Sequence, residues 1–148
     1  MAVEIEEPGW VRALPDAVAL TRRAGGAAAR RRQGGEVTIL LASDAVLRDL
    51  NRRFRGADKA TNVLAFPAPL NRQRHLGDVA LAFGVCAAEA EAQAKPLADH
   101  LRHLVIHGVL HLMGYDHQTE AQAEAMEAIE RDLLASLGVP DPYAGGND

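Results

Sequence analysis

The sequence contains one cysteine, Cys86, and therefore cannot form an internal disulfide bond. Because disulfide bonds are rare in reducing compartments, the simplest expectation is a cytoplasmic protein in which Cys86 is a small apolar residue near a helix start. No stretch approaches the roughly 20 apolar residues of a membrane span, and the acidic N-terminus lacks the features of a signal peptide. We therefore expect no membrane partner.

The chain also lacks the overall positive charge of a general nucleic-acid binder, since its net charge is -4. The charges are unevenly distributed: residues 1–74 carry 13 basic and 8 acidic side chains, and residues 75–148 carry 3 and 12. Five basic residues fall within twelve positions, namely Arg48, Arg52, Arg53, Arg55 and Lys59. Such a cluster attracts a phosphate backbone, although Arg48 and Arg52 fit the solvated face of a helix equally well. The basic run 30–32 fits either RNA binding or the negative end of a preceding helix.

Three histidines, spaced H-x3-H-x5-H in the segment HGVLHLMGYDH, form the most informative pattern in the chain. On a helix, His107 and His111 lie one turn apart on the same face, so both imidazoles can reach one ion. Gly114 can adopt the left-handed conformation that ends the helix, and the chain then returns His117 as a third nitrogen ligand. Three neutral ligands leave one position of a tetrahedral zinc ion open, as in catalytic sites.

The same histidine spacing occurs in the metzincin protease motif H-E-x-x-H-x-x-G-x-x-H. In those proteases the glutamate takes a proton from water, but this chain has Gly108 at that position. The sequence thus keeps the ion site without the peptidase base. A zinc-dependent protease or another metallohydrolase that uses Asp116 as its base stays open as an alternative.

Two further segments accompany the histidine motif and carry a family resemblance. HGVLHLMGYDH resembles H-G-x-L-H-L-x-G-Y-D-H of the bacterial YbeY proteins, and residues 50–67, LNRRFRGADKATNVLAFP, resemble that family's LN-x-x-(Y/F)-R...VLSFP block. Residues 76–79, LGDV, resemble its L-G-D-I strand, so the likeness runs from about Val37 to Leu134. Ala65 departs from the pattern, because the family usually has serine there.

The resemblance implies a metal-dependent, single-strand-specific endoribonuclease that matures the 3′ end of small-subunit rRNA and acts in ribosome quality control. It implies one zinc ion held by His107, His111 and His117, although three imidazoles also suit other transition metals. The expected partners are single-stranded RNA, rRNA and the ribosome rather than DNA, with a small-subunit ribosomal protein and an assembly GTPase added by analogy. A ribosome-binding assembly factor whose ion is only structural is a further alternative.

Two residues are candidates for catalysis beside the ion. Arg55, carried over from the family motif, can offer a guanidinium fork to a phosphoryl group that gains negative charge. Asp116 can accept the second N–H of a ligand imidazole or serve as a proton acceptor, but it also fits a turn residue that bonds its own backbone. We interpret His100 and His103 as surface residues or as residues that support the ligands from behind, and His75 as a strand-end or loop residue.

The expected architecture is one α+β domain at residues 1–140 with a flexible tail at 141–148. Strands are expected at residues 3–6, 36–42, 62–66 and 75–83 in a four-stranded mixed sheet. About five helices are expected at residues 14–32, 44–53, 84–95, 97–113 and 119–137, with a turn at residues 33–35. Ser43 and the Thr119–Gln122 pair are expected caps. By resemblance, the fold is zincin-like, with the helix of the histidines against the sheet.

Overall fold

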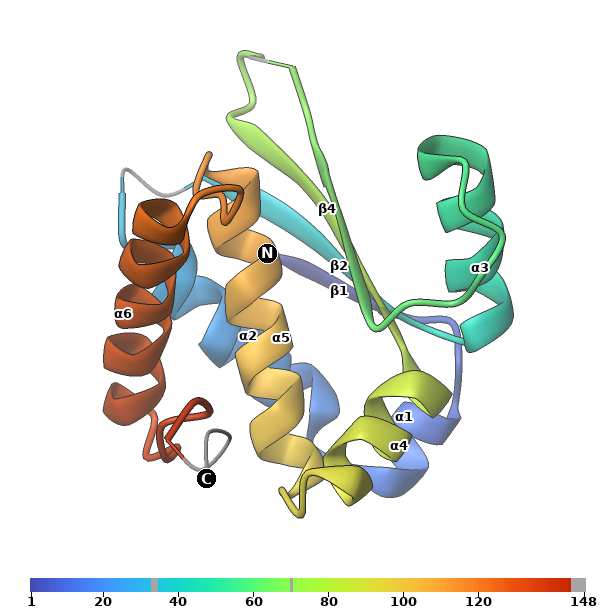
Figure 1. Ribbon diagram of the computed structural model, residues 1–148. Coiled ribbons are helices and arrows are strands. Elements are labelled where there is room, and N and C mark those ends of the chain that lie inside the picture. The colour runs from blue at the N-terminus through green and yellow to red at the C-terminus, as the bar shows by residue number, and fades with distance from the viewer. Residues whose placement is uncertain (33–34, 70, 145–148) are drawn as a thin grey trace.

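A computed structural model describes residues 1–32, 35–69 and 71–144 of the chain (Figure 1). Its four strands, β1 (Ala2–Ile5), β2 (Glu36–Ala42), β3 (Val63–Pro67) and β4 (His75–Ala82), form one sheet in the order β1-β2-β4-β3. β1, β2 and β4 are mutually parallel, and the edge strand β3 runs antiparallel to β4. The predicted four-stranded mixed sheet of an α+β fold is therefore confirmed.

Six helices occur in the described residues: α1 (Gly9–Ala13), α2 (Ala17–Ala29), α3 (Asp44–Arg55), α4 (Phe83–Ala92), α5 (Leu97–Leu112) and α6 (Glu120–Ser136). α2 and α5 lie side by side and contact one side of the sheet, whereas α3 contacts the other side (Figure 1). α6 packs against α5, away from the sheet. The helix that carries the histidines is thus held between the sheet and α6.

The main core lies between α5 and the central strands. Its fully buried side chains include Ile39, Leu41, Val79 and Leu81 from the sheet and Leu101, Val105 and Val109 from α5. A smaller apolar cluster, around Leu47, Leu64 and Ala80, lies on the α3 side of the sheet. The central parallel strands are apolar on both faces because helices cover them from both sides.

Most of the expected elements agree with the structure to within a few residues, and the helix expected at residues 14–32 is α2. The short helix α1 was not predicted: it ends before Leu14, which has an extended conformation with φ -132° and ψ 91°, and α2 begins at Ala17. Pro15 explains the break, because a proline disfavours the helical conformation of the residue before it. Trp10 anchors α1, since its buried indole N–H donates to the Ala42 carbonyl at 3.0 Å.

The two predicted helix caps are confirmed. The Ser43 hydroxyl accepts the backbone N–H of Val46 at the start of α3, and Thr119 forms a reciprocal capping box with Gln122 at the start of α6. His75 opens β4, as expected of a strand-end residue. The turn predicted at 33–35 falls largely on residues 33 and 34, which lie outside the described part of the chain. In that described part, no helix is both long and apolar enough to cross a bilayer.

The last described residues contact α6. Asp141 accepts a hydrogen bond from Arg131 at 3.2 Å, and the Tyr143 hydroxyl donates to Glu130. Residues 145–148 lie outside the described chain, and the flexible tail and the domain boundary at residue 140 stay predictions. The zincin-like character of the fold also stays a prediction.

Gly108 sets how closely α5 approaches the sheet. A Cβ atom at this position would lie 2.7 Å from Cγ1 of Val79, which is fully buried on the central strand β4. A branched side chain locked in the core cannot move aside easily. The structure therefore explains why this position has no side chain and leaves no room for the glutamate of the protease motif.

We predict that Gly108→Ala lowers the free energy of unfolding by about 1–3 kcal/mol, because overpacking against Val79 outweighs the gain in helix propensity. Gly26→Ala in α2 is the matched control: its new Cβ would meet only the flexible end of Arg30, so stability should rise by up to about 1 kcal/mol. Urea unfolding followed by circular dichroism measures both. Equal stabilisation of the two variants would contradict the close contact of α5 with the sheet.

Candidate functional site

The three predicted ligand histidines lie next to one another at the C-terminal end of α5. His107 and His111 are one turn apart on the helix, and Gly114, with φ +95°, reverses the chain after its N–H bonds the His111 carbonyl. The reversal brings His117 back to the helix, as the spacing predicted. The ring centroids are 6.4 Å apart for His107 and His111, 5.5 Å for His107 and His117, and 5.9 Å for His111 and His117.

Hydrogen bonds determine which nitrogen of two of these rings carries the proton. Nδ1 of His107 lies 2.7 Å from a carboxylate oxygen of Glu130, and Nδ1 of His111 lies 2.9 Å from the carbonyl oxygen of Tyr115. A carboxylate and a carbonyl only accept hydrogen bonds, so each Nδ1 must be the donor. In the neutral rings the free lone pair is then on Nε2, the form that binds a metal ion.

The spacing of the rings fits one ion, although the donor atoms do not yet surround a common point. A point equidistant from the three centroids lies about 3.4 Å from each, close to the value for a ring whose nitrogen is about 2.1 Å from zinc. Among the described residues, however, no three His, Cys, Asp or Glu side chains meet the geometry of a metal site. Binding an ion therefore requires the three rings to turn toward their shared centre.

Glu130 of α6 is the main site residue that sequence reasoning missed. Its side chain is completely buried, and its carboxylate accepts hydrogen bonds from His103, His107 and Tyr143. Burial by itself raises the pKa of this carboxyl group, but the three hydrogen bonds outweigh burial and lower the pKa to about 2. The one sequence signal was its position four residues from both Met126 and Leu134, on the buried face of α6.

His100 and His103 are not the surface residues that one reading of the sequence expected. His100 is 4% exposed and its Nε2 lies 2.9 Å from Glu89, while Nε2 of His103 lies 2.8 Å from Glu130. His103 thus contacts the predicted ligand His107 indirectly, through the carboxylate that both rings share. Sequence spacing missed Glu89 as well, which also accepts hydrogen bonds from Asn62.

Arg55 and the three histidines line one small cavity of about 130 Å³. Arg55 ends α3 on the other side of the sheet, and its side chain reaches the edge strand β3, where Nη2 donates to the Ala65 carbonyl at 2.5 Å. The backbone of Ala65 holds the arginine, so this contact needs no hydroxyl at position 65. The fold therefore places the predicted phosphate-binding residue beside the predicted ligands.

Asp116 lies beside the cluster but orients neither His107 nor His111. Its Oδ1 accepts the backbone N–H of His117 at 2.8 Å, which is the turn contact that the sequence left open. Glu130 and the Tyr115 carbonyl occupy the imidazole-orienting positions instead. A role for Asp116 as a proton acceptor stays a prediction.

Three of the other basic residues, Arg32, Arg48 and Arg52, contact groups of the chain itself. Arg32 donates to the Met113 carbonyl at 2.9 Å, so it complements the C-terminal end of α5 rather than of the helix before it. Its guanidinium lies 4.4 Å from the centre of the Tyr115 ring. On α3, Arg48 pairs with Asp58 and Arg52 pairs with Asp49, both on exposed surface.

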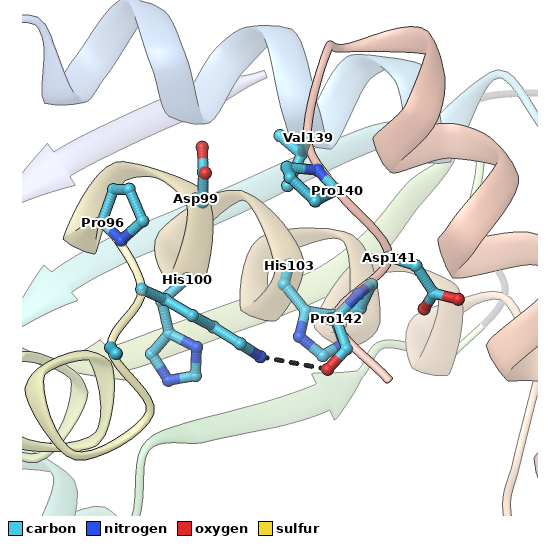
Figure 2. A pocket seen from close by; sticks show the side chains of 10 residues that line it. Pro96, Asp99, His100, His103, Val139, Pro140, Asp141 and Pro142 are labelled. Atoms are coloured by element: carbon cyan, nitrogen blue, oxygen red, sulfur yellow. Dashed lines mark hydrogen bonds between the residues drawn. The ribbon is translucent and has the colours of Figure 1, made fainter. Parts of the chain in front are cut away.

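A second cavity of about 230 Å³ lies near the N-terminal end of α5, away from the ligand histidines. His100, His103 and the chain segment around Pro140 and Pro142 line it (Figure 2). Lys95 donates to the Pro142 carbonyl at 3.1 Å across this cavity (Figure 2). None of the three ligand histidines lines it.

Comparisons with known proteins identify the family of this chain. The family model described as Endoribonuclease YbeY matches residues 7–138. A protein named Endoribonuclease YbeY from Paramagnetospirillum magneticum is 49% identical, with 97% of this chain and 94% of that protein covered. Its namesake from Maricaulis maris is 59% identical over 74% of this chain and 68% of its own length.

A solution structure of a protein from Thermotoga maritima has a similar fold, with a TM-score of 0.59. The two sequences are 24% identical, and the alignment covers 97% of this chain and 99% of the other, so this likeness concerns the fold alone. The family match covers β2, β3, β4, the six helices and the three histidines, and begins after β1. The chain therefore belongs to the YbeY family of endoribonucleases.

Proposed function

We propose that this protein is an endoribonuclease that cuts single-stranded RNA with the help of one zinc ion bound by His107, His111 and His117. The observation that carries the proposal is the shared cavity of Arg55 and the three histidines. Family membership supports the RNA substrate, since the relatives are named endoribonucleases. The nitrogen donors and their tautomers support the ion.

Arg55 has the chemistry to bind the phosphate at which cleavage occurs. Negative charge grows on the phosphoryl oxygens as the phosphodiester is attacked, and a guanidinium can donate two parallel hydrogen bonds to them. The Ala65 carbonyl engages one Arg55 nitrogen, Nη2, and holds the side chain at the β3 edge. Because the arginine is held before RNA binds, less conformational entropy is lost when the phosphate is engaged.

The remaining residues orient the site. A bound zinc ion would supply positive charge that activates water and stabilises charge on the phosphate. Glu130 keeps the lone pair of His107 on Nε2, and the Tyr115 carbonyl does the same for His111. Other transition metals also suit three imidazoles, so the proposal concerns the ligand set first and zinc second.

In the cell, we propose that the enzyme matures the 3′ end of small-subunit rRNA and takes part in ribosome quality control in the cytoplasm. The ribosome, a small-subunit ribosomal protein and an assembly GTPase are the partners proposed by family analogy. The protease alternative lacks its usual base, since Gly108 faces Val79 at a distance that excludes a glutamate. Cleavage of protein substrates with RNA left intact would favour that alternative.

Replacing Arg55 or His111 should abolish RNA cleavage without unfolding the protein. We expect Arg55→Glu and His111→Ala to lower the initial rate on a fluorogenic single-stranded RNA at least roughly 100-fold, through loss of charge stabilisation and of an ion ligand. Arg52→Glu, one turn away on α3, is the matched control and should keep most of the activity because Arg52 does not line the cavity. Wild-type rates for both site variants would contradict the proposed site.

Glu130→Gln should weaken metal binding. The amide keeps the size of the side chain but removes the negative charge that holds the N–H of His107, so we expect roughly 10- to 100-fold lower zinc affinity. Competition with a chromogenic zinc chelator measures the change. Glu124→Gln is the control: it removes a carboxylate from the exposed face of the same helix, lines neither cavity beside the histidines, and should keep wild-type affinity. Unchanged affinity of Glu130→Gln would show that the carboxylate does not support an ion ligand.

Metal removal distinguishes an ion used in catalysis from an ion that only stabilises the fold. The main core between α5 and the sheet contains no ligand histidine, so EDTA treatment should leave the far-ultraviolet circular dichroism intact and remove RNA cleavage. Added zinc should restore cleavage. Loss of helical signal together with activity would instead indicate a structural ion and favour the assembly-factor alternative.

A further inference from the structure

A groove of about 530 Å³ lies between α3 and the sheet, on the side opposite α5. Leu50 and Phe54 of α3 form one wall, and Leu40, Phe66 and Asp78 of the sheet lie across from them. Phe54 is 63% exposed, the most exposed of the large apolar side chains in the described chain. An aromatic ring left open to water at a groove is typical of a binding surface rather than of a core.

Arg55 connects this groove to the candidate site. The rings of Phe54 and Phe66 pack edge to face with centroids 5.5 Å apart, and the Arg55 guanidinium carbon lies 5.4 Å from the centre of the Phe66 ring. The same Arg55 lines the cavity of the three histidines. One side chain therefore separates the aromatic pair from the place where the phosphate would bind.

The charges in the groove favour a base over a phosphate. In the sheet register, Thr38 pairs with Asp78, and Asp78 lies opposite Phe66, so a hydroxyl and a carboxylate stand beside the aromatic ring. Glu4 adds a second carboxylate to the lining. Carboxylates repel a phosphate but accept hydrogen bonds from the N–H groups of a nucleobase. The groove thus offers an aromatic surface for stacking and hydrogen-bond acceptors. The positively charged Arg55 lies between the groove and the histidine site.

We infer that the groove binds one unpaired base of the RNA substrate, next to the nucleotide whose phosphate lies at Arg55, and that this base stacks on Phe54. The inference rests on the proposed function. It explains a preference for single strands, because a base paired in a duplex cannot turn out of its stack into the groove without loss of pairing. Stacking on an aromatic ring accepts any base.

The test measures binding and cleavage separately. Binding of a labelled single-stranded RNA 12-mer is followed by fluorescence anisotropy in EDTA, and cleavage of the same RNA is followed with zinc present. We expect Phe54→Ala to weaken binding roughly 5- to 100-fold, as loss of one base stack does, and Phe54→Leu to behave similarly. Phe54→Trp should bind like the wild type, because it keeps an aromatic face.

Two controls test whether the affinity lost in Phe54→Ala comes from a lost contact with a base. Val11→Ala removes the other exposed large apolar side chain of the described chain, lies outside the groove and should change nothing. The second control is a series of RNAs, each with a single abasic site at a different position. At one position, the abasic RNA should bind the wild-type protein as weakly as the intact RNA binds Phe54→Ala. That abasic RNA should lose no further affinity for Phe54→Ala.

The outcomes separate the two proposals. Wild-type affinity of Phe54→Ala in a protein that still binds and cleaves RNA would overturn the stacking inference and leave the endoribonuclease intact. A weaker Phe54→Ala with no matching abasic position would also overturn it, since the contact would not be with a base. Absence of both binding and cleavage in the wild type would overturn the proposed function itself. Thermal unfolding of each variant confirms that the fold is unchanged.

Discussion

The buried carboxylate of Glu130 is the contact on which the candidate site depends. It joins α6 to two successive turns of α5 through His103 and His107, and it draws Tyr143 of the C-terminal segment onto the same point. An ionised carboxylate taken out of water costs several kcal/mol unless hydrogen bonds compensate it, and three side chains do so here. The same carboxylate orients the ring of His107, so the α5–α6 contact and the geometry of the candidate site depend on one buried group.

The second constraint is the position of β3 at the edge of the sheet. Because no further strand of the described chain covers β3, Arg55 can reach from α3 to the backbone of this strand and meet the histidines of α5. If β3 lay inside the sheet, a neighbouring strand would occupy the place of the Arg55 side chain. The three histidines thus lie on one side of the sheet edge and the aromatic groove lies on the other, with Arg55 between them.

Membership of the YbeY family gives this arrangement a chemical meaning, and the structure adds detail that motif matching does not contain. The motif includes the three histidines, Tyr115 and Arg55, but it does not include Glu130, and it does not show that Glu130 and the Tyr115 carbonyl orient two of the rings. It also says nothing of how close α5 lies to β4, where Val79 leaves no space for a side chain at position 108. A metzincin-like spacing of histidines can therefore occur on a helix that cannot carry the metzincin base.

The sequence by itself determined what depends on local spacing. The three histidines, the glycine turn after α5, the two caps and all four strands were predictable, the strands within one residue, since periodicity and turn chemistry act over a few residues. The short helix α1 before Pro15 was not predicted, because a helix of 5 residues shows too little periodicity to be recognised. Tertiary structure alone decided which distant residues lie beside the histidines. Glu130 lies 23 residues from His107, and a glutamate on a helix is usually solvated, so only the packing of α6 on α5 buries it. The meeting of Arg55 with the histidines likewise depends on strand order, which no local pattern encodes.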